Sequence, residues 1–171
     1  MRAILLTTIA LLPLACSASD LEISNFRSGL ACTNSTQVEG RNGWICHPTE
    51  LILVTDQGSC VFNKEKRLCT WYGFEFDYRS VEKGTKLHCT STMSEPGNSG
   101  NPRGLVKKDS ASDTYELELP EKEGHFYNPQ YIAFNLQAAA DDDFLIDTTC
   151  KNQDSIVFAY KLRLRFPLIL R

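Results

Sequence analysis

Ser99 lies in a glycine-rich segment, which is one arrangement by which enzymes present a nucleophilic serine. The segment is Gly97-Asn98-Ser99-Gly100-Asn101-Pro102, and its glycines allow backbone N–H groups to approach an oxyanion. Such a serine also needs a histidine base and an acid partner. His88 precedes Ser99 by only eleven residues, and His47 lies in a plain Cys-His-Pro context. We therefore interpret the segment as a turn-rich surface loop and predict no catalytic residue.

The remaining polar residues form no metal-binding pattern. The three histidines, His47, His88 and His125, share no ligand spacing. The acidic run Asp141-Asp142-Asp143, with Asp147 after it, lacks the glycine turns that separate the ligands of calcium loops. We therefore predict no metal and no cofactor, and we interpret the acidic run as solvated surface charge.

Six of the seven cysteines are expected to form disulfides, while Cys16 lies in an N-terminal segment that export would remove. An even number of cysteines in an exported chain indicates a disulfide framework, here with fifteen possible connectivities. Zinc is disfavoured because the chain has no Cys-x-x-Cys pair. The pairing that we favour is Cys32–Cys46, Cys60–Cys69 and Cys89–Cys150.

Hairpin geometry supports one of these bridges. Cys60 and Cys69 flank the polar segment Asn63-Lys64-Glu65-Lys66. A tight turn centred on Lys64-Glu65 places Cys60 opposite Cys69, where Cβ atoms are about 4.5–5.5 Å apart, close to what a disulfide requires. We expect this bridge on the hairpin face away from Val61 and Leu68. Trp71, beside Cys69, is either packed against the bridge or a surface aromatic for a partner, and we favour packing.

The first eighteen residues have the three parts of a secretory signal. Arg2 supplies the charge, Ala3–Leu14 are mostly apolar, and small residues follow up to Ala18. The apolar run falls short of the ~20 residues that span a bilayer. We predict a signal peptide over 1–18, a single domain over 19–171, secretion, and no membrane span. Alternatively, Leu14-Ala15-Cys16 resembles a bacterial lipobox, which implies a periplasmic or outer-membrane lipoprotein.

The net charge bears on the class of partner, and one sequence motif bears on modification of the chain. Without Arg2 the chain holds 17 basic and 21 acidic residues, a formal charge of −4, which disfavours nucleic acid as a partner. Asn34-Ser35-Thr36 is an N-glycosylation sequon, so Asn34 is the expected glycan site if the host is eukaryotic.

Alternation of apolar and polar residues dominates the chain and predicts strands. In 68–78, Tyr72, Phe74 and Phe76 face one side, opposite Cys69 and Trp71; in 155–166, Ile156 and alternate residues face inward. Shorter strands are expected at 21–26, with Asn25 on the side of Leu21 and Ile23, and at 44–46, 51–54, 85–91, 115–119 and 131–136. Segments 94–103 and 121–130 are expected loops, and 137–143 a helical turn or a loop.

This pattern predicts an all-β fold, an antiparallel β-sandwich or a small β-barrel stapled by disulfides. The acids Glu116 and Glu118 alternate on one strand, and the bases Lys161, Arg163 and Arg165 alternate on another. Because opposite charges favour cross-strand pairs, we expect these two strands to be neighbours.

Two segments resemble small secreted proteins of filamentous fungi. Cys69–Tyr78 is an aromatic strand, and Glu82–Cys89 is a glycine turn followed by a cysteine-bearing strand, as in those effector-like proteins, some of which resemble the β-barrel mould allergens. The opening 21–26 and the strand after Cys150 fit the same outline. The resemblance implies a secreted, non-enzymatic β-protein with an unknown partner, and it carries over no functional residues.

We therefore expect a secreted, disulfide-stabilised, non-enzymatic binding or effector-type protein. It would act through its surface on an unknown protein or glycan partner. One alternative is a bacterial periplasmic or lipid-anchored inhibitor-type protein. A second alternative is a small secreted hydrolase that uses Ser99 or a His–Asp pair.

Overall fold

The computed structural model describes residues 21–32, 43–54, 57–80, 82–133 and 143–166. The expected signal peptide, Cys16, the Asn34 sequon and most of segment 137–143 lie outside these ranges. Ten strands lie within them: β1 (Leu21–Cys32), β2 (Trp44–Pro48), β3 (Leu51–Leu53), β4 (Gln57–Phe62), β5 (Glu65–Ser80), β6 (Thr85–Gly100), β7 (Val106–Leu119), β8 (Glu123–Ala133), β9 (Phe144–Asn152) and β10 (Ser155–Arg165). No helix of the described ranges is long and apolar enough to cross a membrane.

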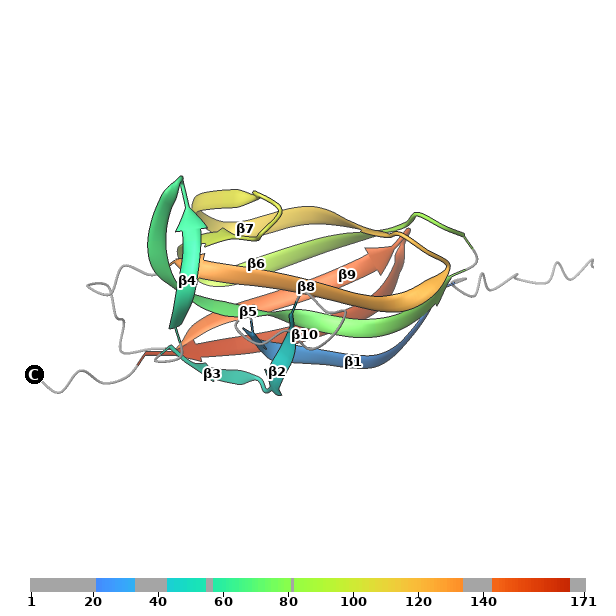
Figure 1. Cartoon of the computed structure of the whole chain (residues 1–171), viewed down its shortest axis with the longest axis horizontal. Coiled ribbons are helices and arrows are strands. Elements are labelled where there is room, and N and C mark those ends of the chain that lie inside the picture. Colours follow the sequence, from blue (N-terminus) through green and yellow to red (C-terminus); the bar gives the residue numbers. More distant parts are fainter. Residues whose placement is uncertain (1–20, 33–42, 55–56, 81, 134–142, 167–171) are drawn as a thin grey trace, which may run out of the picture.

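All ten strands belong to one curled sheet (Figure 1). The strand order is β2-β1-β5-β8-β6-β9-β10-β3, with β4 added to β5 and β7 added to β6. The described pairs are antiparallel except β3 with β10, which is parallel. The curl brings β1 towards β10, where the Phe26 ring lies 4.9 Å from that of Phe158 and 6.0 Å from that of Tyr160. The all-β expectation is confirmed, and the architecture lies between a sandwich and a barrel.

Strand β5 is buried on both faces, and it separates two cores. Its alternate aromatic side chains Tyr72, Phe74 and Phe76 point into the main core, as the period-two pattern predicts. The opposite face carries Cys69 and Trp71. This face belongs to a second, smaller core: Ala31, Ile45, Cys60, Phe62, Cys69, Trp71, Tyr131 and Ala133. Parts of β2 and β4 therefore cover the outside of the sheet.

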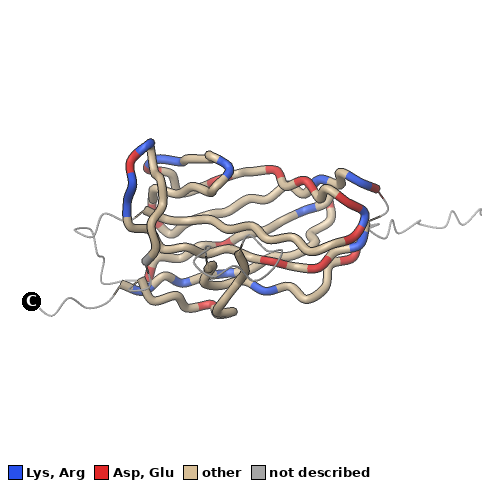
Figure 2. Tube along the Cα trace, in the orientation of Figure 1, with Lys and Arg blue, Asp and Glu red and all other residues tan. Residues whose placement is uncertain are grey.

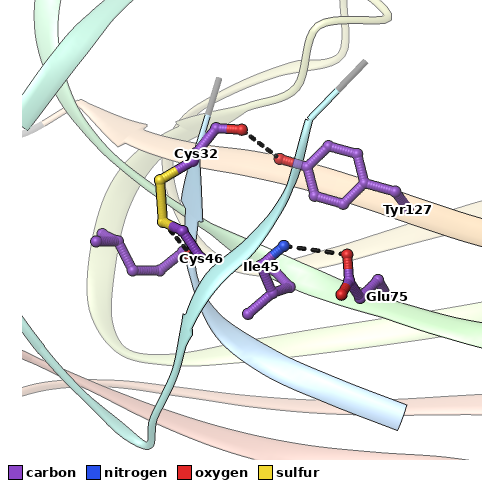
Figure 3. The surroundings of a disulfide bond; sticks show 6 residues. Cys32, Ile45, Cys46, Glu75 and Tyr127 are labelled. Atoms are coloured by element: carbon purple, nitrogen blue, oxygen red, sulfur yellow. Dashed lines mark hydrogen bonds between the residues drawn. A yellow bond between two sulfur atoms is a disulfide. The ribbon is translucent and has the colours of Figure 1, made fainter. Parts of the chain in front are cut away.

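Three disulfides tie the strands together. Cys89 and Cys150 lie directly opposite each other on β6 and β9, and both are fully buried. Cys32–Cys46 joins β1 to β2, and there the Tyr127 hydroxyl donates to the Cys32 carbonyl at 3.3 Å (Figure 3). Cys60–Cys69 joins β4 to β5.

The expected register of the β4–β5 hairpin is wrong by two residues. The turn lies at Asn63-Lys64, whose positive φ angles of 50° and 68° are typical of a two-residue type I′ turn. Cys60 consequently faces Arg67 and not Cys69. Asparagine tolerates the left-handed conformation better than glutamate, which explains the earlier turn. Since a shift of two preserves the faces of a strand, Cys60 and Cys69 still share one face and are bridged diagonally.

We expect the double substitution Cys60→Ala/Cys69→Ala to weaken the protein without unfolding it. The bridge spans nine residues, so the entropy model assigns it about 2–3 kcal/mol. For a domain of this size the melting temperature should fall by roughly 5–10 °C. Thermal unfolding followed by circular dichroism measures this. A non-cooperative transition, or an unchanged melting temperature, would contradict it.

Two segments expected to be loops are largely strand. Strand β6 continues through Ser94 to Gly100, and β8 begins at Glu123. Strand β8 contains Pro129, which lies opposite Gly73 of β5. A Cβ atom on residue 73 would lie 2.2 Å from the Asn128 carbonyl oxygen, so only glycine allows the two strands to come this close. Composition therefore misled the prediction: these glycines and prolines mark close approaches and register shifts inside strands.

Bulges also reverse two expected side-chain directions. A register shift between Ile156 and Phe158 leaves Ile156 64% exposed, although it was expected to face inward. In β1 the shift between Ser24 and Arg27 directs Phe26 to the main core and leaves Asn25 outside with a φ of 51°. A bulge adds one residue to a strand and so inverts the alternation beyond it.

The two charged strands are not neighbours, so the expected pairing of acids with bases is wrong. Glu116 lies on β7, which pairs with β6, and it contacts Lys86 at 2.8 Å. On β10, Lys161 contacts Asp147 and Arg165 contacts Asp143, each at 2.8 Å. The acid of β7 is therefore paired with a base of β6, and the bases of β10 are paired with Asp147 of β9 and with Asp143 just before it.

Candidate functional site

The structure does not bring the candidate catalytic residues together. Ser99 is 3% exposed on β6, and its hydroxyl has no hydrogen-bond partner among the described residues. His88 lies on the same strand eleven residues earlier, and at about 3.3 Å per residue this puts the two roughly 35 Å apart along the strand. His88 is exposed beside Glu116, and His47 is exposed on β2. Asp143 and Asp147 serve the ion pairs of β10.

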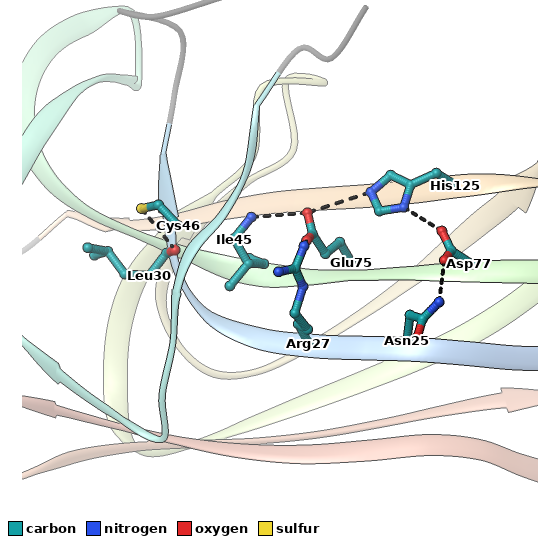
Figure 4. A network of polar contacts seen from close by, with 8 residues as sticks. All are labelled: Asn25, Arg27, Leu30, Ile45, Cys46, Glu75, Asp77 and His125. Carbon is teal, nitrogen blue, oxygen red and sulfur yellow. Dashed lines mark hydrogen bonds and ion pairs between the residues drawn. The ribbon is translucent and has the colours of Figure 1, made fainter. Parts of the chain in front are cut away.

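A His–Asp pair does form, at a different place (Figure 4). His125 on β8 lies 2.8 Å from Asp77 on β5 through Nδ1, and 3.6 Å from Glu75 through Nε2. Asn25 on β1 donates to the other oxygen of Asp77 at 2.7 Å. A nucleophile–base–acid triad needs a hydroxyl or thiol at the second ring nitrogen. Here that nitrogen faces a carboxylate, so the pair is not arranged for nucleophilic catalysis.

Glu75 makes this network a structural one. Its carboxylate is fully buried, is ion-paired with Arg27, and accepts the backbone N–H of Ile45 at 3.1 Å. It therefore holds β2 over the outer face of β1 and β5 (Figures 3 and 4). The residues come from four strands, so no spacing along the sequence indicates the network.

Buried polar side chains also lie inside the curled sheet. Burial raises the pKa of Asp113, while Lys107, 3.6 Å away, acts in the opposite direction. Burial likewise raises the pKa of the Tyr115 hydroxyl. The adjoining cavity of about 10 Å³ has room for about one water molecule. Among the described residues no cluster of three or more His, Cys, Asp or Glu side chains is suited to a metal ion.

The surface feature best suited to a ligand is a groove of about 670 Å³ beside the β4–β5 hairpin, here called the hairpin groove. One wall is the hairpin, the other is the connection from β6 to β7, and the floor comes from β5 and β8. The lining residues are Ser59, Cys60, Val61, Asn63, Lys64, Lys66, Trp71, Asn101, Pro102, Gly104, Val106 and Tyr131.

Two aromatic side chains form the floor and fix the hairpin wall. The rings of Trp71 and Tyr131 meet edge to face, 5.1 Å apart. The Trp71 Nε1–H donates to the Ser59 carbonyl at 3.2 Å, and the Tyr131 hydroxyl donates to the Val61 carbonyl at 2.7 Å. Burial raises the pKa of Tyr131 above its ordinary value. Trp71 is 9% exposed and shares a core with Cys60 and Cys69, as the packing interpretation predicts.

Unpaired positive charge surrounds the hairpin groove. Figure 2 shows Lys and Arg gathered on the hairpin and on the β6–β7 connection at one end of the molecule. No carboxylate of the described residues lies within 4.0 Å of the ammonium groups of Lys64, Lys66 or Lys108. Several lysines elsewhere are paired, as in the 2.8 Å pairs Lys83–Glu121 and Lys86–Glu116, whereas Lys122 and Lys151 have no carboxylate within 4.0 Å among the described residues. The groove is thus locally basic in a chain of net charge −3.

Comparisons with known proteins assign no family. No family model matches the chain, and no curated protein matches it. One solved structure that it resembles is an immunoglobulin-like protein from Pseudomonas aeruginosa, with 11% sequence identity and a TM-score of 0.45. That match covers 86% of this chain and 100% of the other. The resemblance to fungal secreted proteins stays a prediction.

Sequence reasoning missed the hairpin groove because its walls are about forty residues apart in the chain. Its partial signal was the hairpin tip, where Val61, Lys64 and Lys66 place an apolar side chain beside two bases. Tyr131 and Val106 carried no signal. The pairing of β8 with β5 places Tyr131 opposite Trp71 of the hairpin, and the pairing of β6 with β8 and β7 brings Val106 to the same place.

Proposed function

We propose that this chain is an exported, non-enzymatic binding protein that recognises a protein partner through the hairpin groove. The observation that carries the proposal is the groove itself, in which exposed apolar walls meet lysines without carboxylate partners in the described structure. Three disulfides indicate an oxidising compartment. Export through the segment 1–18, with release into the medium, belongs to the proposal.

The architecture supports recognition over catalysis. The hairpin wall of the groove is held by the Cys60–Cys69 bridge and by two side-chain hydrogen bonds to β4. A wall held in this way loses little conformational entropy when a partner binds, which favours affinity. By contrast, the polar side chains of the His125 network are directed at one another.

Two exposed apolar residues make a matched test. Val61, in the groove, is 63% exposed, and Ile156, on β10, is 64% exposed. We expect the mature, oxidised protein to show saturable binding, in the nanomolar to micromolar range, to extracellular or cell-surface fractions of its host or target cells. Val61→Asp should weaken this binding at least about tenfold, because it places a charge in an apolar contact. Ile156→Asp should leave it unchanged.

Labelled protein titrated on these fractions, with unlabelled protein as competitor, measures the effect. Thermal unfolding of both variants checks that the fold is retained. Binding that does not saturate, or that Val61→Asp and Ile156→Asp affect equally, would remove the groove from the proposal.

A further inference from the structure

We infer that the partner presents to the hairpin groove an extended acidic peptide segment with at least one large apolar side chain. This inference rests on the proposed function and specifies the chemistry of its partner. Three features of the groove carry it: apolar walls, a strand edge that offers donors, and local positive charge.

The apolar walls call for an apolar side chain in the ligand. Val61 and Val106 are 63% and 40% exposed and lie on opposite walls of the groove. Pro102 lines the same wall as Val106. Isolated exposed apolar residues need no explanation, but here they face a common cavity. A leucine- or phenylalanine-sized side chain would remove both valines from water.

The edge of β4 presents donors to the groove. Among the described residues β4 pairs only with β5, so its other edge has no strand partner. On that edge the carbonyls of Ser59 and Val61 already accept bonds from Trp71 and Tyr131. In an antiparallel strand the N–H and C=O of one residue point to the same edge. The N–H groups of Ser59 and Val61 therefore point to this edge too, and an extended peptide carbonyl suits them.

The charge around the groove selects acidic residues in the ligand. Lys64 and Lys66 line the wall, and the described lining contains no carboxylate. Lys108 lies exposed on β7, two residues after the lining residue Val106, and Figure 2 shows basic residues gathered at this end of the molecule. Because the whole chain is negative, an acidic ligand is attracted to this basic end and repelled by the rest of the surface.

A peptide fits these features better than an acidic glycan. Sugars are commonly held by stacking on an exposed aromatic face, with polar side chains around it. Trp71 and Tyr131 are only 9% and 3% exposed, and their polar atoms are already bonded to β4. The floor therefore offers little ring surface, whereas the walls offer aliphatic surface.

The test is selection of a random displayed peptide library on the immobilised, disulfide-intact protein. We expect enrichment of peptides with an apolar residue flanked by Asp or Glu, and affinity that falls as salt rises. Lys64→Glu/Lys66→Glu should weaken the selected peptide roughly tenfold, since it replaces two attractions by two repulsions. Lys122→Glu/Lys151→Glu makes the same charge change away from the groove, and should weaken it by less than about twofold.

The outcomes separate this inference from the proposed function. Selection of neutral or basic peptides, or groove-dependent binding of an acidic oligosaccharide in place of peptides, would overturn the inference and leave a binding protein. If no peptide is selected while Val61-dependent binding to extracellular fractions persists, the inference again fails alone. If that binding is also absent, the proposed function fails with it.

Discussion

Replacing Cys89 and Cys150 together by alanine should cause the largest loss of stability among the three bridges. The bridge closes 61 residues, so the entropy model predicts about 4 kcal/mol, and a melting temperature lower by roughly 8–16 °C. Both side chains are fully buried in the main core, so alanine also leaves unfilled space. Urea unfolding of the oxidised variants measures the free energy directly.

The three bridges provide their own controls. Their sequence separations of 61, 14 and 9 predict losses in the order Cys89–Cys150, Cys32–Cys46, Cys60–Cys69. A loss from the Cys60–Cys69 variant equal to that from Cys89–Cys150 would show that chain entropy does not govern these bridges.

Arg27→Met should destabilise the protein by about 3 kcal/mol, because it leaves the buried carboxylate of Glu75 without its ion-pair partner. Glu75 is fully buried, whereas Arg27 is 47% exposed, so the value lies at the low end for a buried pair. Without Arg27, Glu75 keeps the N–H of Ile45, and His125 stays 3.6 Å away. Urea unfolding, read as the midpoint and its slope, gives the loss.

Two further variants separate loss of the ion pair from loss of an arginine. Arg67→Met removes a similar side chain from an exposed pair with Glu65, and should cost no more than about 1 kcal/mol. Arg27→Met/Glu75→Leu should regain much of the loss, since it leaves no buried charge. Equal effects of Arg27→Met and Arg67→Met would show that Glu75 does not need its partner.

Much of the fold follows from alternation along single strands. In β5, Tyr72, Phe74 and Phe76 enter one core while Cys69 and Trp71 enter the other, as their spacing predicts. Alternation fails where a bulge changes its phase, as at Ile156. It also cannot distinguish a glycine of a loop from Gly73, whose missing side chain admits β8. Bulges and close approaches depend on the neighbouring strand, which a single segment does not contain.

The candidate site was less predictable than the fold. Glu75 and His125 belong to a network whose residues come from four strands, and the hairpin groove joins the tip of one hairpin to a connection about forty residues later. Local sequence showed that Val61 lies beside lysines, but not what faces it. Pairing across the curled sheet supplies that information.

The most direct test of the hairpin groove is a photo-crosslink made in the exported protein. A photoreactive amino acid at Val61 should give a light-dependent adduct with a partner protein, and the crosslinked partner peptide should be acidic. The same residue at Ile156, which is equally exposed on β10, should give none. Equal adducts at the two positions, or adducts at Ile156 alone, would contradict recognition through the hairpin groove.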